Sequence, residues 1–138
     1  MHTDNDIKDN VFHFLVNSEL KTAVSGEIRK ISRSPHSAYE DVIISVLAND
    51  SPKQIQQAFV NVNVYVKDVE MKAGNEIYLV EDTNRTKELS RVIADLFTSS
   101  VNGDGYRLSL ENQRVLKGEN THEHVISTRL LYQCVNEK

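Results

Sequence analysis

The segment QQAFVNVNVYVKDVE, residues 56–70, decides the expected fold of this chain. Valine occupies every second position over residues 60–66, and Asn61, Asn63 and Tyr65 lie between the valines. Because successive side chains of a strand point to opposite faces of a sheet, this alternation predicts a strand with one face in a core. The other face carries amides, and what those amides contact is the main functional question that the sequence raises.

A second strand is expected just before the first, in DVIISVLAND, residues 41–50. Val42 begins one apolar face of this stretch and Ile43 begins another, so both faces are largely apolar, which is typical of a central strand. The polar connection around Ser51-Pro52-Lys53 is short. Two strands joined by so few residues should pair antiparallel.

Three helices are expected on the same grounds. The capping-box spacing of Thr3 and Asp6 begins a helix of about residues 4–17. Ser18 can cap a second, short helix, for which Gly26 supplies a natural end. A third helix has apolar residues at positions i, i+3, i+4, i+7 and i+8, namely Leu89, Val92, Ile93, Leu96 and Phe97.

The remaining segments complete the predicted architecture. Residues 27–33 suit an edge strand, 67–82 suit a long excursion or one short extra strand, and 106–111 and 123–134 alternate like strands with a polar stretch between them. The expected fold is therefore α+β, with two layers, a mostly antiparallel four- or five-stranded sheet and helices packed on one face. The length predicts a single domain over all 138 residues.

Composition limits the classes of function. The 16 Lys and Arg residues against 20 Asp and Glu give a net charge of −4, which argues against a main role in binding nucleic acid. Arg29, Lys30 and Arg33 lack interleaved aromatic residues and predict a solvated edge. The single cysteine, Cys134, excludes an intrachain disulfide. No run of eighteen apolar residues occurs, so no membrane span is expected, and the acidic first ten residues predict no export signal.

Motifs for catalysis or metal binding are sparse. His122 and His124 are two positions apart and their rings could share a side, but a metal site needs three or four convergent ligands. Cys134 is interpreted as a small buried apolar residue, and Glu40-Asp41 as a solvated edge or a salt-bridge partner. We therefore expect no catalytic residue, no bound metal and no cofactor.

The amide face has two interpretations. It can be the solvated side of a sheet, which any polar residue would satisfy. Alternatively it contacts another protein, because amides offer both donors and acceptors, and Ile43 and Leu47 would add apolar area beside them. The candidate interface residues are Asn61, Asn63, Tyr65 and Phe59.

The order of these features resembles that of a known family. The opening helix, YEDVIISVLAND, AFVNVNVYVKD, RTKELSRVIADLF, GYRLSLENQRVL and EHVISTRLLYQ together resemble the tail terminator, or tail completion, proteins of long-tailed bacteriophages and prophages. The resemblance covers nearly the whole chain. The segments 40–44 and 60–66 carry most of it.

The resemblance implies a structural protein that forms a ring, generally a hexamer, on the head-proximal end of a finished tail tube. Its partners would be copies of itself, the tail tube protein and a head-completion or connector protein, with no membrane and no direct nucleic-acid contact. It would act in the host cytoplasm during assembly and in the virion tail or neck. Three alternatives remain: another phage neck protein, a small dimeric binding module, and a small hydrolase or metal enzyme built on His122, Glu123 and His124.

Overall fold

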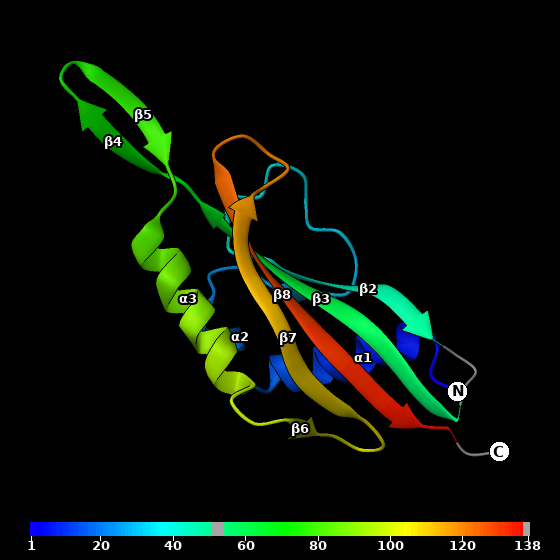
Figure 1. Cartoon of the computed structure of the whole chain (residues 1–138). Coiled ribbons are helices and arrows are strands. Elements are labelled where there is room, and N and C mark those ends of the chain that lie inside the picture. The colour runs from blue at the N-terminus through cyan, green and yellow to red at the C-terminus, as the bar shows by residue number, and fades with distance from the viewer. Residues whose placement is uncertain (51–53, 137–138) are drawn as a thin grey trace.

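The computed structural model describes residues 1–50 and 54–136, which form three helices and two sheets (Figure 1). The predicted connection around residues 51–53 lies outside the described residues. The helices are α1 (Asp4–Val16), α2 (Glu19–Ala23) and α3 (Thr83–Leu96). The strands are β1 (Ile28–Arg29), β2 (Val42–Asp50), β3 (Ile55–Lys67), β4 (Val69–Ala73), β5 (Glu76–Val80), β6 (Val101–Asn102), β7 (Arg107–Lys117) and β8 (Glu123–Val135).

The larger sheet has six strands in the order β1-β2-β3-β8-β7-β6. β1 pairs parallel with β2, and the other neighbours pair antiparallel, so the sheet is mixed. The α+β class is confirmed, whereas the expected count of four or five strands is wrong. The edge strand expected over residues 27–33 is present as β1, but it has only two residues. The strand that was not expected is β6, whose two residues are too few to leave a periodic pattern in the sequence.

The position of β2 also differs from the expectation of a central strand. Its outer neighbour β1 pairs only with Val42 and Ile43, so the rest of β2 is an edge of the sheet. Leu47, further along β2, is 49% exposed. The apolar residues on both faces of β2 therefore do not reflect burial on both faces within one chain.

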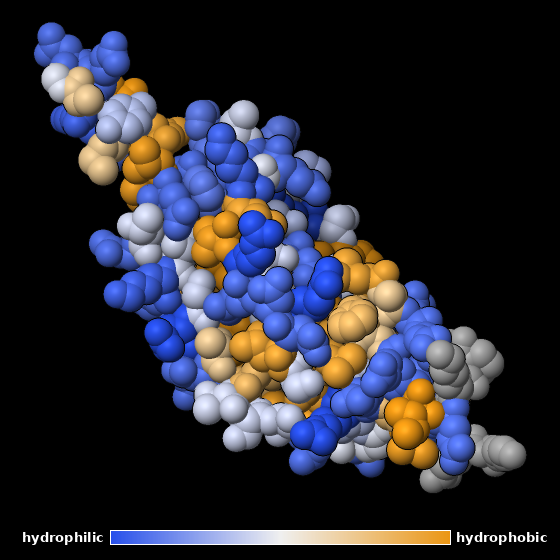
Figure 2. All heavy atoms as spheres, viewed as in Figure 1, coloured by the Kyte–Doolittle hydropathy of each residue, from blue (hydrophilic) through white to orange (hydrophobic). Residues whose placement is uncertain are grey.

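Residues 67–82 form a β-hairpin, where the sequence indicated an excursion or one short strand. β4 and β5 pair only with each other and make the second sheet, which protrudes beyond the end of α3 (Figures 1 and 2). The turn contains Gly74 with φ +64°, a left-handed conformation that glycine adopts without a Cβ clash. β5 corresponds to the one short strand that the sequence left open, whereas β4 and its pairing with β5 were not predicted, because neither face of these strands is buried and no core pattern marks them.

β7 is longer than the predicted strand over 106–111, because the polar stretch that follows continues it to Lys117. The register against β8 shifts between Leu110 and Asn112. A bulge of this kind moves the later side chains to the opposite face and interrupts the alternation of apolar and polar residues along the strand. The last strand agrees with its prediction, since β8 begins at Glu123.

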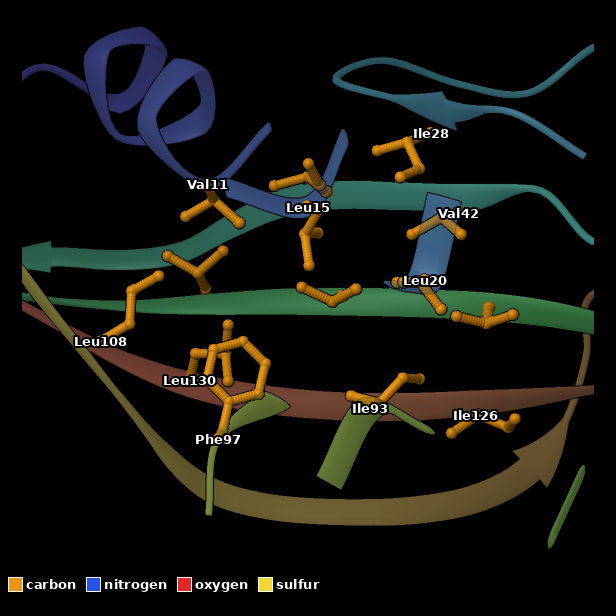
Figure 3. Close-up of a cluster of buried hydrophobic side chains, with 14 of the residues drawn as sticks. Val11, Leu15, Leu20, Ile28, Val42, Ile93, Phe97, Leu108, Ile126 and Leu130 are labelled. Atoms are coloured by element: carbon orange, nitrogen blue, oxygen red, sulfur yellow. The ribbon is translucent and has the colours of Figure 1, made fainter. Parts of the chain in front are cut away.

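One hydrophobic cluster joins the three helices to the inner face of the sheet (Figure 3). The alternate valines of β3 from Val60 to Val66 are all buried, as predicted. The helices add buried residues at helical spacing, and α1 begins with the expected capping box at Thr3 and Asp6. Side chains that point into the cluster include Val11, Leu15, Leu20, Ile93, Phe97, Leu108, Ile126 and Leu130.

An ion pair fixes the start of α3 against the segment before β2. Arg85 donates to both carboxylate oxygens of Glu40 at 2.6 Å and to the carbonyl of Ala23 at 2.6 Å. Glu40 also accepts the backbone N–H of Ser25. The interpretation of Glu40 as a salt-bridge partner is thus confirmed. Burial would raise the pKa of Glu40, but the hydrogen bonds from Arg85 and Ser25 outweigh it and lower that pKa below its ordinary value.

Replacing Glu40 with glutamine should lower the free energy of unfolding by about 2 kcal/mol at neutral pH, because a charge-assisted contact is lost. Since the folded pKa is lowered, the ion pair contributes fully above the ordinary value of 4.5 and loses its contribution as pH falls through the folded pKa. The difference between wild type and Glu40→Gln should therefore shrink below about pH 4.5, as urea unfolding at several pH values would measure. The control is Glu88→Gln, because Glu88 is an exposed partner of Arg85, and this change should have little effect on the free energy of unfolding. A constant difference down to pH 2.5 would contradict this account.

Candidate protein-binding surface

The face of β2, β3, β8 and β7 that points away from the helices is here named the outer sheet face. The register of the antiparallel strands places Ile43, Asn63 and Ser127 in one cross-strand row of this face. Asn61 and Arg129 lie in the next row. Figure 2 views the molecule from this side and shows hydrophobic patches separated by hydrophilic ones. The predicted interface residues thus share one surface.

The two amides at its centre are hydrogen-bonded to each other. The Asn61 amide nitrogen donates to Asn63 Oδ1 at 2.9 Å and lies 3.1 Å from Ser127 Oγ. Ser127 Oγ in turn lies 3.3 Å from Asn61 Oδ1. Both amides remain partly exposed. The side chains are thus held in fixed positions with donors and acceptors left over for a partner.

Tyr65 lies at one end of the outer sheet face, where the loop before β2 covers it. The guanidinium of Arg33 stacks 3.7 Å from the centre of the Tyr65 ring and donates to both oxygens of Glu123 at 2.8 and 2.6 Å. The side chains of Arg33 and Glu123 are only 12% and 8% exposed. Burial raises the pKa of Tyr65, so its hydroxyl stays protonated over the physiological range. Tyr65 is consequently less available to a partner than the sequence suggested.

Phe59 lies toward the other end and is half-buried. It pairs with Leu131 on β8 and lies against the guanidinium of Arg129, 5.6 Å from the ring centre. Leu47 on β2 and Leu116 on β7 are exposed, at 49% and 39%. Exposed apolar groups bordered by amides and arginines are typical of surfaces that bind protein.

The histidines do not form the site that a metal enzyme would need. His122 precedes β8 with φ 72°, while the Nδ1 atom of His124 lies 2.7 Å from Asp68 Oδ1. Glu123 is engaged by Arg33. Within residues 1–50 and 54–136, no three His, Cys, Asp or Glu side chains gather closely enough to hold a metal ion. Cys134 is buried, in agreement with its interpretation as a small core residue.

The three cations considered for nucleic acid are each paired with an acid. Arg29 lies 2.9 Å from Glu27, Lys30 lies 2.8 Å from Asp9, and Arg33 holds Glu123. Their charge is therefore largely neutralised within the chain. Among the described helices, none has the length and apolar character needed to cross a membrane.

Sequence reasoning missed two parts of this surface. Arg33 was grouped with the cations of an edge strand, although its partner Glu123 is 90 residues away. Arg129 was not singled out. No local pattern could have joined these residues, because Arg129 reaches Phe59 through the pairing of β3 with β8, and Arg33 reaches Tyr65 from the loop before β2.

Comparisons with known proteins show a shared fold. A chain from the virion of the native gene transfer agent (GTA) particle matches with a TM-score of 0.55 and 12% identity, over 94% of this chain and 95% of that chain. A second solved protein structure matches with a TM-score of 0.51 and 12% identity, over 96% and 92%. No protein-family model and no curated protein matches the sequence.

Proposed function

We propose that this chain is a non-catalytic structural protein of a phage or prophage particle. The observation that carries the proposal is the fold shared with a chain of the gene transfer agent virion, which extends over nearly the full length of both proteins. The outer sheet face supports it, because its exposed apolar and amide side chains suit a protein that works by contact with other proteins.

The finer proposal is a tail terminator. In this role the protein forms a ring, generally a hexamer, on the head-proximal end of the tail tube, ends tube polymerisation and prepares head joining. The element order that resembles this family along most of the chain supports it. A ring also requires two different patches per subunit. The outer sheet face and the protruding β4–β5 hairpin are two separate exposed surfaces.

The test is the native mass over a concentration series, by light scattering after size exclusion, with and without purified tail tubes. We expect a hexamer, or a monomer recruited to tube ends. A dimer whose mass does not change with concentration, and which does not bind tail tubes, would contradict the tail-terminator proposal and favour a dimeric binding module.

The variant Asn61→Asp/Asn63→Asp should weaken that assembly. It places two like charges side by side, which should cost about 1 kcal/mol of folding stability while leaving the fold intact. In an interface, those charges should reduce association further. Lys87→Ser/Arg91→Ser, on exposed positions of α3, changes the net charge equally and is the control. If both variants assemble equally well, the amides lie outside the interface. If the aspartate variant loses its circular dichroism signal, the two amides are needed for the fold itself.

A further inference from the structure

One side of the β4–β5 hairpin is mostly apolar. Antiparallel pairing places Val69 opposite Val80 and Met71 opposite Tyr78, and residues directly opposite each other share a side. Ala73 continues the same side toward the turn, where its cross-strand partner is Glu76. Val69, Met71 and Tyr78 are each more than two-fifths exposed. This set of five residues is here named the hairpin apolar side.

Within the described part of the chain, Val80 is partly buried and the other four residues of the hairpin apolar side are exposed. All five residues of β4 are exposed, and Figure 1 shows the hairpin extending away from the body. A two-stranded hairpin is marginally stable in water unless its apolar side packs on something else. Apolar surface of this kind on a protruding element marks a contact with another chain.

The charges of the hairpin and of the outer sheet face are opposite. On the hairpin strands, residues 69–80, the charged side chains are Glu70, Lys72 and Glu76, all exposed, and Glu76 lies opposite Ala73 on the hairpin apolar side. On the outer sheet face, Arg107, Arg114 and Arg129 project from β7 and β8. Both surfaces also present apolar groups at their centres. Such complementarity orients an encounter and selects its partner.

We propose that the β4–β5 hairpin of one copy docks on the outer sheet face of a second copy. The hairpin apolar side packs on the apolar part of that face, near Phe59 and Leu131, and Glu76, on the same side of the hairpin, faces the arginines. This contact joins two different patches, so it is heterologous and builds a ring or a longer array. It rests on the self-assembly in the proposed function, but not on tail termination.

Two variants, each defective in one patch, test the contact. Met71→Ser/Tyr78→Ser removes the hairpin anchors, and Arg114→Glu/Arg129→Glu reverses the charge of the sheet face. Each variant alone should raise the dissociation constant of self-assembly at least about tenfold, because buried anchors and complementary charges dominate such contacts. An equimolar mixture should form dimers and no larger species, since only one intact hairpin and one intact sheet face can meet.

Matched controls keep the outcome specific. Ile77→Ser/Leu79→Ser removes two apolar residues from the opposite side of the same hairpin. Lys87→Glu/Arg91→Glu makes the same charge reversal on α3. Both should assemble like wild type, and all variants should keep the wild-type circular dichroism and melting temperature.

Three outcomes would overturn the docking proposal. If wild type assembles and the hairpin variant assembles equally well, the docking proposal fails while the ring stands. If the hairpin variant loses only its recruitment to tail tubes, the hairpin binds the tube instead. If wild type stays monomeric under every condition, including with tube ends, self-assembly and this contact both fail.

Discussion

Replacing Val62 with aspartate is expected to abolish the folded state. Val62 is 1% exposed and lies in the middle of β3, among the alternate valines that face the helices. A carboxylate there would be buried without a partner or would have to bind a proton at neutral pH. The cost is about 4 kcal/mol or more, which is a large part of the stability of a domain of this size.

The control for this change is the neighbouring position on the opposite face. Asn63→Asp keeps an oxygen that can accept the hydrogen bond from Asn61, and its side chain is partly exposed. Its free energy of unfolding should change by less than about 1 kcal/mol. Circular dichroism and urea unfolding of both variants would measure the contrast. A folded Val62→Asp protein would mean that the two faces of β3 are reversed.

The second large effect is expected at Arg33. Its Nη2 atom donates to both carboxylate oxygens of Glu123, and both side chains are nearly buried. Arg33→Met leaves Glu123 with only the backbone N–H of Asn120 among these contacts. Removing one member of a buried ion pair costs about 3 to 5 kcal/mol because the other charge stays desolvated. Urea unfolding should report a loss in that range.

The double variant separates the ion pair from simple packing. Glu123→Gln in the Arg33→Met background removes the stranded charge and keeps an oxygen for Asn120, so most of the lost stability should return. Lys30→Met, which breaks the exposed pair with Asp9, should cost less than about 1 kcal/mol. If the double variant is as unstable as Arg33→Met alone, the effect comes from lost packing on Tyr65 and not from the charge.

Some residues of the candidate surface were predictable from their local sequence, and others depend on contacts between distant segments. Phe59, Asn61 and Asn63 were predicted as one face of one strand, because alternation alone places them together. That they bind a partner stays a prediction. The cover over Tyr65 was not predictable, since Arg33 and Glu123 are brought to it from distant parts of the chain. The hairpin was missed because its strands have no buried side to mark them.

The sequence by itself determined the helices, the β2–β3 pairing and the inner face of the sheet. These follow from capping residues and from apolar periods, which are local properties that burial enforces. The tertiary structure alone decided the strand order, the short strand β6, the bulge in β7 and the ion pairs of Arg33 and Arg85. Those features depend on which distant segments become neighbours. Contacts between distant segments stabilise the fold without producing a periodic pattern of residues in the sequence.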